Sequence, residues 1–209
     1  MDLIDLYEEY REDPAFEHLR GEHIKLVPGR GNERPSVMIL GEAPGAQENL
    51  HGEPFVGRSG HLLDQLMREA GLYADDQWRY PMDSDDDPPE VAIYANTFIT
   101  NTVKYRPPAN RTPSRREIEA SRPWILKEWK ILGKPKVIIT TGAVPLACIK
   151  PELLPVSDAA GRPFVLKPST LTLWPMFHPA FALRNKPMRP VVERHWQDLG
   201  EWLQGEGIT

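Results

Sequence analysis

One stretch of the chain, residues 41–60, combines residue types that together suit a ligand-binding site. It holds five glycines and two prolines, and it carries the carboxylates of Glu42 and Glu48 and the ring of Phe55. Glycine lets the backbone approach a ligand closely, and a helix that begins near Ser59 would offer unpaired N–H groups. A carboxylate can stabilise positive charge or activate water, and an aromatic ring offers a stacking face. The stretch therefore predicts a binding or catalytic loop.

Two other positions carry polar side chains directly after apolar runs. Asn101 offers an amide with both a donor and an acceptor, and His178 offers an imidazole that can donate to an oxygen on which negative charge develops. From the residues alone, Asn101 is better explained as a cap at the end of a strand. Basic residues form two groups that could bind phosphate or could be solvated: Lys104, Arg106, Arg111, Arg115 and Arg116, and then Arg184, Lys186, Arg189 and Arg194.

The elements that would position these residues alternate between strands and helices. Runs rich in β-branched and other apolar residues predict strands at 37–40, 91–103, 136–141 and 171–177. Apolar periodicity and capping signals predict the main helices at about 1–20, 60–70, 114–131 and 190–204. Right-handed crossovers then give an α/β fold, a three-layer α/β/α sandwich with a central, mostly parallel four-stranded sheet. Ligands of such sheets bind beyond the carboxyl ends of the strands.

The composition restricts the kind of protein. The 209 residues predict a single domain, with residues 1–23 as an N-terminal helical extension and residues 74–90 as an acidic loop excursion. The formal net charge of −5 argues against a generic basic nucleic-acid binder, although five carboxylates gather in residues 83–90 alone. No run approaches the roughly twenty apolar residues of a membrane span, and the acidic start is not typical of a secretory signal. We expect a cytoplasmic monomer with no membrane partner.

The three polar loops together resemble the uracil-DNA glycosylase superfamily, and within it the family 4 type. Its first motif is matched by Gly41-Glu-Ala-Pro-Gly45, then Glu48, then Gly52-Glu-Pro-Phe-Val-Gly57 and Gly60-His-Leu-Leu63. Its asparagine strand and basic loop are matched by Thr100-Asn-Thr-Val-Lys-Tyr-Arg-Pro-Pro-Ala-Asn-Arg-Thr-Pro113, and its last motif by Phe177-His-Pro-Ala180 with Leu183-Arg-Asn185. The similarity spans about residues 24–204. Each motif alone is weak, but all three in this order form a specific signal.

The resemblance implies a monofunctional DNA glycosylase that flips a uracil nucleotide out of DNA and hydrolyses its N-glycosidic bond, giving free uracil and an abasic site. Glu42 would stabilise the positively charged sugar and orient or deprotonate water, and His178 would donate to uracil O2. Asn101 would pair with the uracil edge, Phe55 would stack on the base, and Glu48 would crowd the 5-methyl group of thymine. The implied base pocket comprises Gly41, Ala43, Glu48, Phe55 and Asn101.

The resemblance also implies contacts with uracil-containing DNA, single- or double-stranded. Leu183 would be a wedge in the minor groove, and basic side chains would hold the DNA backbone. The implied DNA-binding residues are Lys104, Arg106, Arg111, Leu183 and Arg184. Two alternatives remain open. One is a glycosylase for another modified pyrimidine, and the other is a catalytically inert DNA-binding or replication subunit with the same fold.

The chain departs from the family pattern at its cysteines. Family 4 enzymes carry four cysteines that hold an iron–sulfur cluster, whereas this chain has only Cys148, in an apolar helical stretch where a buried, inert thiol is expected. Tyr105 and Ser121 stand at two of the cysteine positions, and the N-terminal pair falls near residues 16–19. We therefore expect no cluster, no metal and no other cofactor, with apolar packing of Tyr105 and the N-terminal helix in its place. A second departure is Asn49, where the family usually has Asp.

Overall fold

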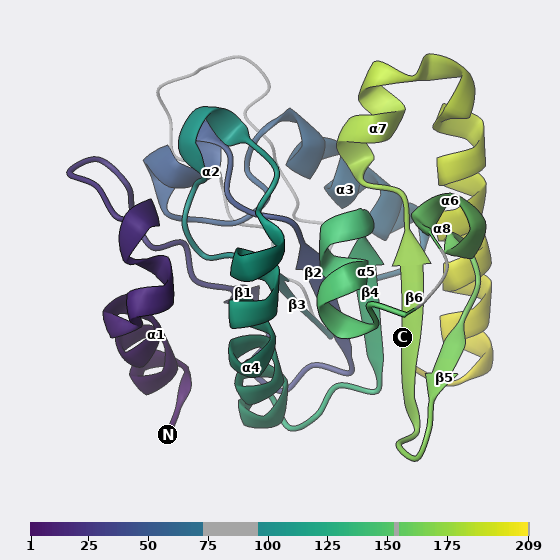
Figure 1. Cartoon of the computed structure of the whole chain (residues 1–209). Coiled ribbons are helices and arrows are strands. Elements are labelled where there is room, and N and C mark those ends of the chain that lie inside the picture. Colours follow the sequence, from purple (N-terminus) through teal and green to yellow (C-terminus); the bar gives the residue numbers. More distant parts are fainter. Residues whose placement is uncertain (73–95, 153–154, 209) are drawn as a thin grey trace.

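The centre of the fold is a mixed sheet. The structure is a computed structural model that describes residues 1–72, 96–152 and 155–208. Its sheet has six strands in the order β1-β3-β2-β4-β6-β5 (Figure 1). The neighbouring central strands run parallel, namely β3 (Thr97–Asn101), β2 (Val37–Gly41), β4 (Val137–Thr141) and β6 (Leu171–Met176). The edge strands β1 (Arg30–Gly31) and β5 (Phe164–Leu166) pair antiparallel with their neighbours.

The predicted α/β class and mostly parallel sheet are confirmed, but the predicted number of four strands is too low. The four predicted strands correspond to the four parallel ones. The two additional strands contain two and three residues, which is too short for a periodic apolar pattern to form. The second predicted strand began at residue 91, and residues 91–95 lie outside the described part of the chain.

Helices cover both faces of this sheet (Figure 1). In the described residues the α-helices are α1 (Leu3–Glu12), α2 (Ala46–His51), α3 (Arg58–Glu69), α4 (Arg115–Ile131), α5 (Ala143–Ile149), α6 (Val156–Ala159), α7 (Pro179–Arg184) and α8 (Arg189–Gly205). Three short 3₁₀ helices join them: η1 (Pro14–Leu19), η2 (Pro108–Asn110) and η3 (Lys186–Met188). The long helix α4 begins where its capping signal predicts, because Ser114 and Glu117 form a reciprocal capping box.

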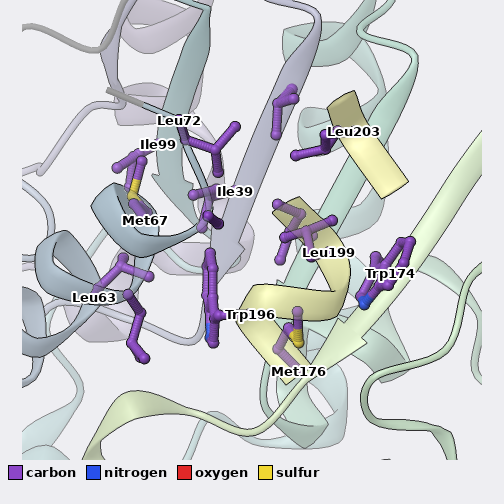
Figure 2. Packing of buried hydrophobic residues seen from close by; sticks show 14 of the residues in the cluster. Ile39, Leu63, Met67, Leu72, Ile99, Trp174, Met176, Trp196, Leu199 and Leu203 are labelled. Carbon is purple, nitrogen blue, oxygen red and sulfur yellow. The ribbon is translucent and has the colours of Figure 1, made fainter. Parts of the chain in front are cut away.

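Two apolar clusters lie between the sheet and the helices that cover its two faces. On one face, α3 and α8 pack on Ile39 and Ile139, and Figure 2 shows Trp196, Leu199 and Leu203 of α8 in this layer. On the other face, α4, α5 and α6 pack on the strand residues whose side chains point to that face, among them Met38 and Ile138. Because both faces are covered, every residue of β2, β3 and β4 is buried, as is usual for parallel sheets.

The remaining predictions on organisation concern single segments. Cys148 is fully buried, as predicted, and burial raises the pKa of its thiol to about 11, which is consistent with an unreactive side chain. The acidic excursion at 74–90 lies outside the described residues. Within the described ranges, no helix combines the length and the apolar character that crossing a membrane requires.

Candidate active site

The site is built at the carboxyl edge of the parallel strands. Gly41 at the end of β2 pairs in register with Asn101 at the end of β3, and Thr141 of β4 pairs with Met176 of β6. The chain leaves β2 into Glu42 and leaves β6 toward His178. Three loops far apart in sequence therefore meet at one edge of the sheet, as parallel topology requires.

Gly41 is the point on which two of the predicted side chains converge. A Cβ atom at this position would lie 2.3 Å from Asn101 Oδ1 and 2.5 Å from Phe55 Cζ, distances that real side chains do not tolerate. The absence of a side chain thus allows the amide of Asn101 and the ring of Phe55 to share one small space. Asn101 is only 3% exposed, and no hydrogen bond from the described residues engages its side-chain amide.

Phe55 is held in an unusual backbone conformation. Its φ is +56°, in the left-handed region that non-glycine residues rarely adopt. Gly60 supports this turn, because a Cβ atom there would lie 1.9 Å from the carbonyl oxygen of Phe55. The ring lies 6.0 Å from the imidazole of His178, with an angle of 23° between the planes. The two rings therefore form neighbouring walls of one site, and the strain is consistent with a functional position.

Glu48 holds the glycine-rich loop together. Its Oε2 accepts the N–H of Gly45 at 3.0 Å, and its Oε1 accepts the N–H groups of Val56 and Gly57 at 3.1 and 2.8 Å. These three bonds fix the backbone on both sides of Phe55. The carboxylate is turned toward the backbone of its own loop, and its expected steric action on thymine stays a prediction.

The loop after Asn101 is joined directly to the loop of Glu42. The N–H of Thr102 donates to the carbonyl of Gly41 at 2.9 Å, and the N–H of Val103 donates to the carbonyl of Glu42 at 3.1 Å. The hydroxyl of Thr102 also donates to Gly41 O at 2.8 Å. The segment that follows Asn101 and the segment that contains Glu42 are thus joined by hydrogen bonds between their backbones.

His178 is positioned as a neutral hydrogen-bond donor. It caps α7, with its Nδ1 accepting the N–H of Ala180 at 3.1 Å. Burial, together with the nearby charge of Arg184, lowers the pKa of the imidazole to about 4. Because Nδ1 is an acceptor, the proton of the neutral ring lies on Nε2. At neutral pH, His178 therefore offers one N–H and no positive charge.

Glu42 is half-buried beside the same loop. Burial raises the pKa of its carboxyl above the ordinary value, while the charge of Arg184 and a hydrogen bond with Thr112 counteract part of that rise. The contact between Thr112 and Glu42 was not predicted, because in the sequence Thr112 is only one of the residues that precede a helix. A carboxylate in this setting can carry negative charge and accept a proton at moderate acidity.

Lys104 corrects the predicted set of DNA contacts. Its side chain is buried rather than exposed, and its Nζ lies 2.9 Å from Glu128 Oε2. The ammonium also donates to Asn101 O at 2.8 Å and to the hydroxyl of Thr100. Tyr7 completes the group by donating its hydroxyl to Glu128. The predicted contact between Lys104 and DNA does not fit this buried environment. Lys104 instead stabilises the end of β3 through its hydrogen bond to Asn101 O.

The other basic residues predicted to contact DNA are less deeply buried than Lys104. Arg184 is exposed and close enough to influence the pKa values of Glu42 and His178. Arg106 is half-buried and donates to Asn110 Oδ1 at 2.7 Å. Arg111 is exposed, but both of its terminal nitrogens pair with the carboxylate of Glu117, at 2.6 and 2.8 Å.

Two predicted residues contact the protein core. Leu183 is half-buried and packs against the apolar layer beneath α7, so the conformation described here does not present it as a free wedge. Ala43 packs against a third apolar cluster, formed by Tyr10, Phe16 and their neighbours. Within residues 1–72, 96–152 and 155–208, no group of three or more His, Cys, Asp and Glu side chains could hold a metal ion.

Known proteins resemble this chain along most of its length. A family profile described as "Uracil DNA glycosylase superfamily" matches residues 28–200. The chain is 33% identical to the type-4 uracil-DNA glycosylase of Saccharolobus solfataricus, over 88% of this chain and 78% of that protein. It is 35% identical to the type-4 enzyme of Pyrobaculum aerophilum, over 86% and 82% of the two chains. The corresponding protein of Thermotoga maritima is 31% identical, over 87% and 85%. The chain belongs to the uracil DNA glycosylase superfamily.

Proposed function

We propose that this protein is a monofunctional uracil-DNA glycosylase, which hydrolyses the N-glycosidic bond of deoxyuridine in DNA to give free uracil and an abasic site. The observation that carries the proposal is the convergence on Gly41 of the Asn101 amide and the Phe55 ring, with the His178 imidazole stacked beside that ring. Pure DNA binding needs no such set of groups in a buried position. The names of the type-4 relatives support the same activity.

The base is recognised by Asn101 and Phe55. The amide of Asn101 offers one donor and one acceptor, which match O4 and N3–H of uracil. Cytosine presents the reversed pattern and would leave buried polar groups unpaired, which discriminates strongly against it. Because a paired base is out of reach of these side chains, the nucleotide must first be flipped out of the duplex or be single-stranded.

Bond cleavage is divided between His178 and Glu42. As the glycosidic bond breaks, the sugar gains positive charge and the leaving uracil gains negative charge, which accumulates on O2. The neutral Nε2–H of His178 can donate to that oxygen without transferring its proton. The carboxylate of Glu42 can stabilise the sugar cation and orient or deprotonate the attacking water. Arg184, whose charge acts on both groups, can hold a phosphate of the extruded nucleotide.

The test is uracil release from an oligonucleotide that carries one deoxyuridine, in single- and double-stranded form, followed by alkaline cleavage of the abasic site. We expect release in the presence of a metal chelator, and large losses of kcat in Glu42→Gln, Asn101→Ala and His178→Ala. Gly205→Ala is a matched control, since the space around that position is open. Binding of the uracil strand without any release would refute the proposal and favour an inert DNA-binding subunit.

A panel of oligonucleotides tests the other alternative. Each carries a single modified pyrimidine in place of uracil, and thymine and cytosine serve as controls. Preferential release of another base would redirect the proposal to that base. We expect uracil to be released fastest, with thymine and cytosine retained.

A further inference from the structure

The positions at which the family 4 resemblance implies cysteines lie close together in the structure, although they carry no thiol. Phe16, Leu19 and Tyr105 are all buried in one apolar cluster. Ser121 is fully buried, and its hydroxyl donates to Glu117 O at 2.8 Å. Aromatic rings, an aliphatic chain and one hydroxyl are not ligands of an iron–sulfur cluster, which is held by thiolates. The residues present therefore do not fit that group.

Aromatic packing occupies this region instead. Tyr10 stacks on Phe16 with ring centroids 4.5 Å apart, and it meets Trp124 edge-on at 5.4 Å. Tyr105 lies 5.8 Å from Tyr10. We call Tyr10, Phe16, Leu19, Tyr105 and Trp124 the aromatic plug. Ring pairs at such distances stabilise a fold by more than their buried area alone.

Polar contacts tie the plug to the junction of α1 and η1. Trp124 Nε1 donates to Asp13 Oδ2 at 2.7 Å, and the other carboxylate oxygen of Asp13 accepts the N–H of Ala15 at 2.9 Å. Arg20 Nη2 donates to Asp13 O at 2.5 Å. Asp13 thus fixes α4 to the junction of α1 and η1, so the plug has one defined geometry.

The plug reaches the active site through the segment that follows Asn101. The hydroxyl of Tyr10 accepts the N–H of Lys104 at 3.1 Å, and the N–H of Val27 donates to Lys104 O at 2.8 Å. One residue earlier, the N–H of Val103 donates to the carbonyl of Glu42. Residues 102–105 are therefore held on one side by the plug and on the other by the segment that contains Glu42.

We propose that the aromatic plug takes the structural place of an iron–sulfur cluster, and that Tyr10 is a positioning residue that acts on Asn101 and Glu42 through residues 102–105. It follows that the protein folds and acts without iron. The part of this inference that concerns activity rests on the proposed glycosylase function, whereas the parts that concern iron and loop geometry do not.

The first experiment measures iron. Protein is produced in iron-replete cells and purified without oxygen, and its metal content and visible absorbance are recorded. We expect iron far below one atom per chain and no charge-transfer band. Iron at cluster stoichiometry, with a band that is lost on oxidation, would overturn the inference.

The second experiment removes one atom from the plug. Tyr10→Phe keeps the ring but leaves the buried N–H of Lys104 without its acceptor, and we expect that amide to exchange with solvent about tenfold faster. Uracil release should show a lower kcat with a nearly unchanged KM. Ile4→Ala on the same helix is the control, since Ile4 is 69% exposed and outside the plug.

The outcomes separate the two proposals. A lower melting temperature with unchanged exchange at Lys104 and unchanged kcat would show that Tyr10 only stabilises the fold, and the inference would fail. If wild-type protein releases no uracil, the glycosylase function fails, while the exchange and iron measurements still decide the inference. Faster exchange at Lys104 in Ile4→Ala as well would count against a specific role of the hydroxyl.

Discussion

Replacing Lys104 by methionine tests whether this side chain binds DNA or supports the pocket from inside. Methionine keeps most of the length and the apolar stem, but it removes the ammonium that contacts Glu128 and Asn101 O at 2.9 and 2.8 Å. Glu128 is fully buried, so its charge would remain without the partner that compensates it. The substitution therefore affects folding and the end of β3 together.

The expected loss of stability follows from the burial of the Lys104–Glu128 ion pair. Removing one partner of a buried ion pair costs about 3–5 kcal/mol in the free energy of unfolding. For a chain of this size each kcal/mol lowers the melting temperature by about 2–4 °C, so a fall of about 6–20 °C is expected. Lys104→Met combined with Glu128→Leu should be more stable than Lys104→Met alone, because no uncompensated charge remains.

Two measurements decide between the roles. Thermal unfolding by circular dichroism gives the loss of stability, and the salt dependence of DNA binding gives the number of phosphate contacts. A lysine that contacts phosphate changes the slope of log K against log salt by about one when it is removed. We expect an unchanged slope for Lys104→Met. An unchanged melting temperature together with a shallower slope would refute the reasoning and return Lys104 to the DNA interface.

The remaining predictions concern the pocket. Gly41→Ala should abolish uracil release while Gly205→Ala does not, because a methyl group at 41 would clash with Asn101 and Phe55; equal activity of the two variants would contradict the described pocket. Arg184→Ala removes a positive charge that lowers the pKa of Glu42, so the acid limb of the pH–kcat profile should move to higher pH, and an unmoved limb would count against this contact. The pKa of His178 is about 4 when folded and about 6.5 when unfolded. The unfolded chain therefore binds the extra proton, and the stability contributed by neutral His178 is lost as pH falls from 6.5 towards 4. Denaturant unfolding across that window should show a smaller loss of stability in His178→Gln than in wild type.

The placement of the site could be predicted because it depends on the order of elements rather than on detailed packing. Apolar runs that alternate with helices specify a parallel sheet, and the carboxyl ends of parallel strands meet at one edge. Glu42 and His178 each follow such a run and Asn101 lies at the end of another, so their proximity follows from the topology. The protonation behaviour of Glu42 and His178 did not follow, because it depends on burial, on the charge of Arg184 and on the hydrogen bond from Ala180 to His178 Nδ1.

The role of Lys104 could not be predicted from its neighbours in sequence. It stands at the start of a basic, proline-rich loop, where a lysine is normally solvated. Its partner Glu128 is 24 residues away in the sequence, on α4. Only the packing of α4 beside β3 places the two charges together in the interior. The short strands β1 and β5 were missed for a related reason, since edge pairing depends on neighbours that a local pattern does not contain.

Lys104 makes hydrogen bonds through its side chain and through its backbone, and these bonds reach different parts of the fold. Its side chain donates to Asn101 O, while its own N–H donates to the hydroxyl of Tyr10 and its carbonyl accepts from Val27. Lys104 thus connects the end of β3 to α1, to the segment around Val27 and to α4. If Asn101 pairs with the base as proposed, its amide requires this kind of support, because a hydrogen-bonding group that discriminates between two bases loses selectivity when its own position is not fixed. In this chain the Lys104–Glu128 ion pair and the hydroxyl of Tyr10 provide that support.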